Sequence, residues 1–471
     1  MNLRDPQAFS LNRRLFLGTS AAAIAAGAPL AANHSSAGNL GIAPFRFDIT
    51  PPMGHSLCGG WIKPVEGFDD QLEAIGYVIT GLEKPIVVCA VDWTGLLNSA
   101  HIAWRTALAN AAGTTIDRVA VQCVHQHNAP FACLDAEKIV QAQEGLPHIV
   151  EPGYFQQCLT RGAEAVRTAL KSTLPLTHVA TGEARVDRVA GNRRIIGTNG
   201  KVISQRGSSS RNPHHHRLPE GLIDPMLKTV SFYSNEKKLV AAHYYACHPM
   251  SYYGDGRVSA DFCGLARKQR QEEEPGCTHL YFNGCGGNIG AGKYNNGSKE
   301  ARVELTSRMF DAISESESQL DRTEIKNISW VTEDILPTVD TDRFNEDLLM
   351  KQISDSKQRV VSRNRPSYTV AFIRRIAAEI PITLSGLHVN DASILHLPSE
   401  SFIEYQFRAQ SDAPDRFVAC AAYGDGGPWY LPTKEAYPQG GYAVSVAWCR
   451  PEVDDLLSRG VGTLLAKAKN A

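Results

Sequence analysis

Residues 85–130 read PIVVCAVDWTGLLNSAHIAWRTALANAAGTTIDRVAVQCVHQHNAP, and this stretch decides the expected fold. Its two β-branched runs, 85–90 and 119–124, have the composition of buried strands. Between them, residues 99–112 place apolar side chains at helical spacing. A strand, a helix and a second strand in this order predict a crossover unit of an α/β protein.

Further elements are expected on both sides of this unit. The same criteria predict strands at 40–50, 227–233, 238–246, 279–282, 379–389, 392–397 and 417–422, and helices at 154–172, 301–320 and 345–364. The polar segment 203–221 is expected to be a long loop. Because the chain contains no repeat and no long linker, we expect a mixed α/β (α+β) fold in one domain or in two fused lobes.

Composition limits the classes of partner. The 471-residue chain is 43% hydrophobic and 21% charged, which is ordinary for a globular protein with a large core. Its formal net charge is −1, and it has no long basic run. Nucleic acid and anionic membranes are therefore not expected as partners. A small-molecule substrate is expected instead, and the oligomeric state is left open.

The N-terminus has the features of an export signal. Residues 12–18 read NRRLFLG and are followed by an alanine-rich stretch to about Ala32. This pattern predicts a twin-arginine signal peptide over residues 1–35, a mature domain over 36–471, and a periplasmic or secreted protein. The alternative is a tail with arginines by chance. The apolar run is too short for a transmembrane segment.

The eleven cysteines contain no C-x-x-C pair, so a zinc ribbon or a thioredoxin-like motif is not expected. They are expected to be buried small hydrophobes, although one or two disulfides remain open.

A glycine-rich loop, YFNGCGGNIGAGKYN at 281–295, suggests phosphate binding at first sight. A P-loop needs serine or threonine after its lysine, but Tyr294 follows Lys293. A dinucleotide fingerprint would need glycine where Ile289 stands. Nucleotide binding is therefore not expected. The loop is expected to form a tight turn between a strand and a helix.

Groups that can bind metals follow several predicted strands. His125 and His127 share one face if the strand continues through them. His248 ends another strand, and Glu400 follows a third. The segment 423–442 adds tyrosines. Two or three imidazoles, a carboxylate and a phenol would suit a catalytic zinc ion with an open position for water.

These stretches belong to a series of motifs that resembles the neutral/alkaline (non-lysosomal) ceramidase family, from residue 47 to residue 442. The series consists of FDITPPMG (47–54), VHQHNAP (124–130), GNRR (191–194), CHPMS (247–251), VSAD (258–261), PSE (398–400), YLPTKEAY (430–437) and Tyr442. The resemblance implies a single large catalytic domain of that family. Because few residues follow Tyr442, we do not expect the C-terminal immunoglobulin-like domain of the family.

The resemblance also implies the site. One zinc ion per chain would be held by His125, His248, Glu400 and Tyr430. His127 would be a proton shuttle or a substrate contact, and Arg193 would contact the substrate. Tyr437 or Tyr442 would donate to a developing oxyanion. Substrate contacts are expected from Trp61, Asn288 and Trp429, although the two tryptophans could instead pack beneath their loops.

One residue departs from the family pattern. The loop at 281–295 matches the stretch whose serine is the proposed nucleophile, and Gly290 falls at the place of that serine. Cys285 lies too early to replace it and is expected to be packed beneath the loop. The sequence therefore predicts attack by metal-bound water.

Three functions remain open. The first is a zinc-dependent hydrolase of an amide or related bond, with a lipid amide as substrate. The second is a carbohydrate-active enzyme on the same fold that cleaves a glycoside or an N-acyl sugar, because flat aromatic side chains in polar loops suit sugars. The third is a non-catalytic metal-binding homologue.

Overall fold

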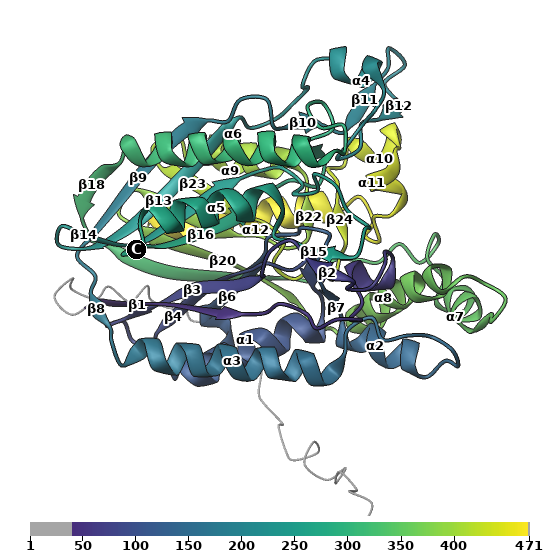
Figure 1. Cartoon of the computed structure of the whole chain (residues 1–471), viewed down its shortest axis with the longest axis horizontal. Coiled ribbons are helices and arrows are strands. Elements are labelled where there is room, and N and C mark those ends of the chain that lie inside the picture. Colours follow the sequence, from purple (N-terminus) through teal and green to yellow (C-terminus); the bar gives the residue numbers. More distant parts are fainter. Residues whose placement is uncertain (1–39, 470–471) are drawn as a thin grey trace, which may run out of the picture. The chain divides into compact units, whose positions relative to one another are not determined.

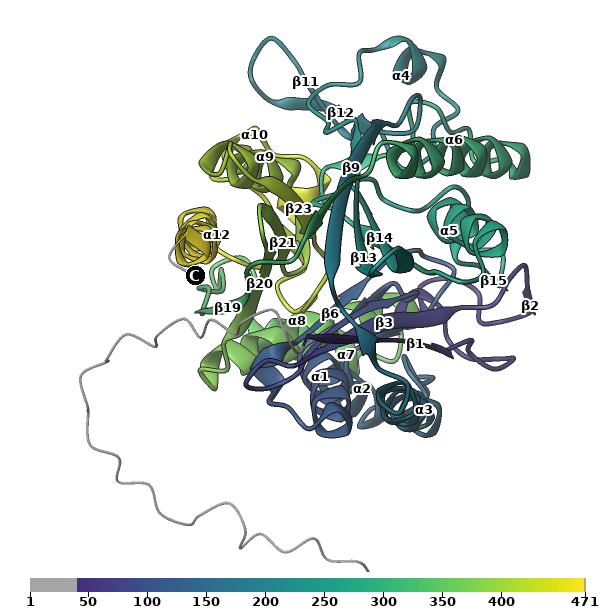
Figure 2. The ribbon, with the colours of Figure 1, turned by 90° about the vertical axis from the view of Figure 1, so that its left-hand side faces the viewer.

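Three sheets organise the computed structural model, which describes residues 40–469 (Figures 1 and 2). The expected signal peptide at 1–35 lies outside the described residues. Sheet 1 has the order β6 (Val119–Cys123), β4 (Ile86–Val91), β3 (Glu73–Thr80), β1 (Gly41–Asp48) and β8 (Leu174–Pro175). Sheet 2 has the order β16 (Thr278–Asn283), β14 (Lys237–Tyr245), β13 (Met226–Ser234), β9 (His178–Arg185) and β18 (Asp321–Glu324). Sheet 3 has the order β19 (Ile328–Ile335), β20 (Ile382–Val389), β21 (Ala392–His396) and β23 (Phe417–Ala421).

Helices cover the outer face of each sheet, as Figure 2 shows. Sheet 1 carries α1 (Ser99–Ala112) and α3 (Pro152–Leu170). Sheet 2 carries α5 (Asp261–Glu273) and α6 (Lys299–Ser318). Sheet 3 carries α9 (Ile403–Asp412) and α12 (Val453–Lys469). The inner faces of the three sheets meet around β16, so the central strands β3, β14 and β20 are buried on both faces, whereas the edge strand β18 is exposed.

The remaining helices and five pairs of short strands connect the sheets in the described part of the chain. The helices are α2 (Leu134–Gln141), α4 (Pro213–Arg217), α7 (Glu346–Ser354), α8 (Val360–Ala377), α10 (Ala436–Gln439) and α11 (Tyr442–Ser445). The paired short strands are β2 (Gly67–Phe68) with β15 (Arg257–Val258), β5 (Gly95–Leu96) with β7 (Phe131–Ala132), β10 (Gly191–Asn192) with β17 (Ile289–Gly290), β11 (Arg194–Ile196) with β12 (Val202–Gln205), and β22 (Glu400–Ser401) with β24 (Tyr430–Leu431).

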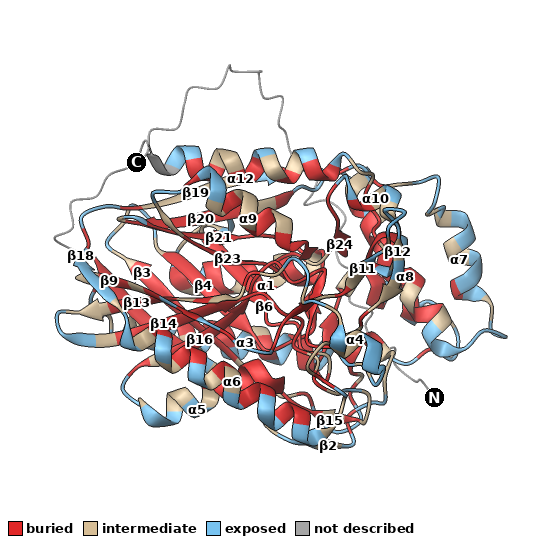
Figure 3. Cartoon of the chain, turned by 90° about the horizontal axis from the view of Figure 1, so that it is seen from above, coloured by how far each residue is buried: buried red, intermediate tan, exposed pale blue. Residues whose placement is uncertain are grey.

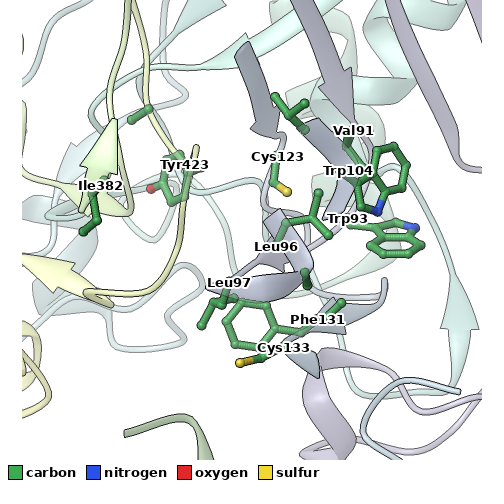
Figure 4. Packing of buried hydrophobic residues seen from close by; sticks show 14 of the residues in the cluster. Val91, Trp93, Leu96, Leu97, Trp104, Cys123, Phe131, Cys133, Ile382 and Tyr423 are labelled. Atoms are coloured by element: carbon green, nitrogen blue, oxygen red, sulfur yellow. The ribbon is translucent and has the colours of Figure 1, made fainter. Parts of the chain in front are cut away.

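The crossover unit predicted from residues 85–130 is confirmed. Strand β4 is followed by α1, which has the predicted bounds, and then by β6, which pairs with β4 in parallel. Trp93 and Trp104 pack against each other beside this unit, with ring centroids 5.4 Å apart (Figure 4). The mixed α/β fold in one compact unit is confirmed as well.

Two local predictions were wrong. Residues 345–364 form α7 and the start of α8 rather than one helix. The break occurs because the Asp355 carboxylate accepts the Lys357 backbone N–H and so offers the backbone a turn in place of the helix. The segment 203–221 is not entirely loop, since it includes α4, whose first turn is capped by the Asn212 side chain.

The core is continuous from sheet to sheet (Figure 3). Tyr77 of sheet 1 packs on Phe232 of sheet 2 with ring centroids 5.3 Å apart, and Leu387 of sheet 3 joins the same cluster. All eleven cysteines are buried and unpaired, including Cys285. None of the helices in the described part is both long and apolar enough for a membrane span.

Buried histidines make the stability of this fold depend on pH. Burial lowers the pKa of His243 to about 4 and of His279, His388 and His396 to about 3. Below about pH 6.5 the unfolded chain binds protons at these histidines and the native chain does not. We therefore expect the free energy of unfolding to fall between pH 6.5 and 4, by ~1.4 kcal/mol per pH unit for each histidine.

Urea unfolding between pH 7 and 4.5 measures this slope. Replacing His388 by Asn removes one of the four contributions and lowers the slope. The matched change His214→Asn, at an exposed position, leaves the slope as it is. A free energy of unfolding that stays constant down to pH 4.5 would contradict the prediction.

Candidate metal centre

The candidate site lies where three parallel strand pairs end. Strands β4 and β6, β14 and β16, and β21 and β23 are parallel neighbours. His125 follows β6, His248 follows β14 and Glu400 follows β21. The carboxyl ends of parallel strands are where loops converge on a ligand in α/β folds. Residues far apart in the chain therefore meet at one place.

His125 is fixed in one tautomer. Its Nδ1 donates to the backbone oxygen of Thr94 at 2.6 Å, which leaves Nε2 as the lone-pair atom. That Nε2 is buried and has no hydrogen-bond partner. The backbone of His125 is left-handed, with φ 77°, an uncommon conformation outside glycine. The chain thus holds a strained backbone that presents one free imidazole nitrogen.

His248 is oriented in the same way by the glycine-rich loop. Its Nδ1 donates to the Gly286 backbone oxygen at 2.8 Å, and its Nε2 lies 3.0 Å from Glu400 Oε2. A backbone carbonyl on the far nitrogen is the usual support of a metal-binding histidine. The loop that resembled a phosphate cradle therefore supplies a carbonyl group to His248.

Glu400 is placed by close backbone packing. Its strand β22 pairs with β24 so that Glu400 lies beside Tyr430. A Cβ at Gly287 would come within 2.2 Å of the Glu400 backbone oxygen, so only glycine allows this approach. Glu400 Oε2 is 3.6 Å from His125 Nε2 and has no hydrogen-bond donor. Three candidate ligand atoms thus converge, and Tyr430 lies next to them.

The protonation states favour metal binding. Burial, together with nearby Arg193, lowers the pKa of His248 to about 4, so the ring is neutral at pH 7. Burial opposes the charge of Glu400, but His125 and His248 outweigh it and hold the pKa of Glu400 well below its ordinary value. Neutral imidazoles and an ionised carboxylate are the forms that bind a metal ion. The donor set is one that could hold a divalent metal ion.

His127 and Arg193 lie against this set. The His127 ring is 4.8 Å from the His125 ring, and its Nδ1 has no partner. His125, His127 and His248 also form a group whose ligand atoms lie within 4.8 Å of one another. Arg193 donates to the Tyr430 hydroxyl at 3.1 Å and to His248 Nε2 at 3.3 Å. The structure therefore brings six of the expected residues together.

The two candidate oxyanion donors differ in position. The Tyr442 ring lies 5.8 Å from the Tyr430 ring and is 40% exposed, at the edge of the site. The Tyr437 hydroxyl donates to the Cys449 backbone oxygen at 2.8 Å. Among the contacts of the described residues, none joins Tyr437 to the histidines or to Glu400. The structure places Tyr442, not Tyr437, beside the candidate ligands.

The three expected substrate contacts differ in where they lie relative to the candidate ligands. Trp61 and Trp429 pack at 5.3 Å, and Trp429 lines a cavity of about 20 Å³ that also includes His125 and Glu400. Asn288 is buried and faces away from this cavity, since it bonds to Glu404 at 2.9 Å and to the Ile403 backbone N–H at 2.9 Å. The tryptophans are at the site, and Asn288 ties the glycine-rich loop to α9.

Several supporting residues were not identified from the sequence. Asn283 accepts from the Cys247 backbone N–H at 3.1 Å and donates to the Val124 backbone oxygen at 3.4 Å, so it links the strand ends that carry His125 and His248. Thr94 and Gly286 act through backbone oxygens, which no motif reveals. The one sequence feature that could have pointed to Asn283 is its place directly after the predicted strand 279–282.

A second group of possible ligands is less suitable for a metal ion. His243, His279 and Glu317 lie together in sheet 2 and α6. Lys238 and Arg270 both contact Glu317 at 2.6 Å, and His243 Nε2 contacts His279 Nδ1 at 3.1 Å. Because its carboxylate is already neutralised, this group suits a structural network.

The fold is that of the neutral ceramidases. The crystal structure of neutral ceramidase from Pseudomonas aeruginosa superposes with a TM-score of 0.65 at 15% identity, over 91% of this chain and 75% of that one. A second structure, a ceramidase complexed with C2, gives 0.65 at 12% identity over the same shares. The chain matches no protein-family model and no curated protein sequence. At these identities the likeness concerns the fold, and it agrees with the resemblance seen in the motifs.

Proposed function

We propose that this protein is an exported zinc-dependent hydrolase of the neutral ceramidase superfamily that cleaves an amide or related bond with water as the nucleophile. One observation carries the proposal: the buried Nε2 atom of His125 and Oε2 of Glu400 have no hydrogen-bond donors and converge with His248. Tyr430 would complete the zinc ligands. Export rests on the sequence of residues 12–18 alone.

The residues around the ligands have complementary tasks. Zinc held there would supply a site that lowers the pKa of bound water to about 7 and polarises a carbonyl group. Burial and the neighbouring histidines hold the pKa of His127 well below its ordinary value, so its neutral ring accepts a proton from the attacking water. Arg193 is 8% exposed, and its Nε has no partner, so it is available to hold the carbonyl oxygen. Tyr442 adds a phenol at the edge.

Gly290 supports water rather than a side chain as the nucleophile. It forms a bridge with His248 and pairs with Gly191, the residue two positions before Arg193. A Cβ there would meet the Arg193 side chain at 3.4 Å. A serine side chain would therefore have pointed toward Arg193, and glycine leaves that place to substrate or water.

A carbohydrate substrate is the second candidate. Trp61 is half-buried at the edge of the site, and its ring lies against Phe131, Tyr368 and Trp429. A flat aromatic surface beside the ligands suits a sugar ring as well as an acyl chain.

Metal removal tests the proposal directly. We expect about one zinc ion per chain, and hydrolysis that stops on chelation and returns with zinc, because the set has three or four ligands and an open position. Metal analysis also distinguishes zinc from iron, which two histidines and one carboxylate can bind. The substrate panel contains a short-chain ceramide, simple N-acyl amides, glycosides and N-acyl sugars.

The controls separate the three functions. Turnover of amides alone supports the proposal, and turnover of glycosides alone supports the carbohydrate alternative. Zinc binding without turnover of any compound supports a non-catalytic homologue. Protein that is purified without metal, and that does not bind zinc, contradicts the proposal.

A further inference from the structure

Arg365 is a second cation at the edge of the site, and the motif series does not include it. It lies on α8, and its NH2 donates to the Tyr442 hydroxyl at 2.9 Å. Its guanidinium carbon is 5.2 Å from the Trp61 ring. Both neighbours adjoin the candidate ligands: Tyr442 packs on Tyr430, and Trp61 packs on Trp429. Arg365 therefore completes the edge of the site between a phenol and an indole.

The guanidinium of Arg365 has no acidic partner. Among the described residues, no carboxylate lies within 4.0 Å of it, and the Tyr442 hydroxyl is the one hydrogen-bond acceptor that it contacts. A guanidinium has five N–H donors, so most of those of Arg365 are free. Two other arginines of α8 use their donors within the fold: Arg374 pairs with Glu346 at 2.8 Å, and Arg363 donates to the Ile353 backbone oxygen at 2.8 Å. The planar guanidinium of Arg365 therefore has free N–H groups that can bind a carboxylate of a ligand through two parallel hydrogen bonds.

The charges around the opening have the same sign. Arg193 also lacks a carboxylate within 4.0 Å, and its guanidinium carbon lies 5.9 Å from the Tyr442 ring, so both arginines are close to Tyr442. Glu400 is the carboxylate among the candidate ligands, and a bound zinc ion would more than neutralise it. The two arginines, together with a metal ion when one is bound, would form a positive field, which concentrates anionic substrates and disfavours cationic ones.

We propose that the substrate is an anionic amide, and that Arg365 binds its carboxylate while Tyr442 and Trp61 hold the guanidinium in place. The inference rests on the proposed hydrolase function and adds the substrate class to it. The carboxylate would lie several bonds from the scissile carbonyl, because the Tyr442 and Tyr430 rings separate Arg365 from the ligands.

The test compares matched pairs of compounds. N-octanoyl-glycine, N-octanoyl-4-aminobutyrate and N-octanoyl-6-aminohexanoate are each assayed beside their neutral carboxamides. A charge-assisted hydrogen bond changes an equilibrium by about tenfold to hundredfold. We expect the wild-type protein to prefer at least one carboxylate over its carboxamide by that factor in kcat/KM. In Arg365→Met the ratio falls to about one.

Three further variants separate recognition from structure. Arg365→Lys keeps the charge and retains part of the preference, whereas loss of fold would not depend on charge. Tyr442→Phe removes the hydroxyl but keeps the cation, so the preference is reduced and not abolished. Arg374→Met, a change to another arginine of α8, leaves the ratio at the wild-type value. A wild-type ratio near one, or equal ratios in wild type and Arg365→Met, overturns the inference.

Binding provides a readout that does not depend on turnover. The same pairs are titrated calorimetrically into the zinc-loaded protein. If no compound is hydrolysed but the carboxylates bind at least tenfold more tightly in wild type than in Arg365→Met, the hydrolase proposal fails and the anion site stands. If amides are hydrolysed with no preference for charge in either measurement, the hydrolase stands and the anion site fails.

Discussion

Replacing Glu400 by Gln is expected to reduce zinc binding at least about a hundredfold. Loss of a residue that only supports a metal ligand costs ten- to a hundredfold, and loss of a ligand costs more. Gln keeps the size of the side chain but removes the charge that lies 3.0 Å from His248 Nε2 and 3.6 Å from His125 Nε2. Two neutral imidazoles and a phenol would remain, and these offset the charge of the dication poorly.

The measurement is the zinc content after dialysis against a buffered zinc concentration, together with kcat/KM on the best amide substrate. Glu404→Gln is the matched control, because Glu404 is a half-buried carboxylate four residues after the buried Glu400 and contacts Asn288 at 2.9 Å instead of the histidines. We expect Glu404→Gln to keep about one zinc per chain. Equal zinc content in wild type and Glu400→Gln would remove Glu400 from the ligand set.

Much of this site followed from one-dimensional patterns. His125, His248 and Glu400 each end an apolar run, and the carboxyl ends of parallel strands meet, so their convergence could be predicted once the strands were recognised. The place of a residue at the end of a strand depends on the neighbouring residues in the sequence, so it can be predicted without the fold. The choice between Tyr437 and Tyr442 is not local. Tyr437 ends the motif YLPTKEAY and Tyr442 follows it closely, and only the fold shows that Tyr437 donates to the Cys449 backbone oxygen.

The other features that were not predicted from the sequence also depend on contacts between residues that are distant in the chain. Arg365 lies one residue beyond the predicted helix 345–364, and its importance comes from Trp61 and Tyr442, which are distant in the chain. Strand β3 contains a central glycine, Gly76, which weakened the strand pattern. Helix α12 contains two glycines and was not predicted, yet it packs its apolar face on sheet 3. Tertiary packing outweighs helix propensity there.

Replacing Arg375 by Met is expected to lower the free energy of unfolding by about 3–5 kcal/mol, because it leaves a buried carboxylate without its partner. Arg375 NH1 contacts Asp425 Oδ2 at 2.5 Å, and both side chains are about 5% exposed or less. Burial opposes ionisation of Asp425, but Arg375 and His101 outweigh it and hold the pKa of Asp425 well below its ordinary value. That contribution to stability is present above about pH 4.

The pair also positions the site. Asp425 Oδ1 accepts the backbone N–H groups of Asn98 and Gly427, each at 3.0 Å, and so fixes the loop that continues into Trp429 and Tyr430. We therefore expect Arg375→Met to weaken zinc binding as well as the fold. In the double variant with Asp425→Asn, no charge is left unpaired and the Asn side-chain oxygen still accepts both N–H groups, so stability returns by about 1–3 kcal/mol.

Urea unfolding of the two single variants and the double variant measures this coupling. Arg374→Met is the matched control, since the pair of Arg374 with Glu346 is 51% and 36% exposed and exposed pairs contribute less than about 1 kcal/mol. The pH dependence of the free energy of unfolding distinguishes the variants further. As the pH falls through 4, Asp425 in Arg375→Met takes up a proton and the deficit relative to wild type becomes smaller. A deficit equal to that of Arg374→Met, or one that grows in acid, would show that the Asp425 charge does not depend on Arg375.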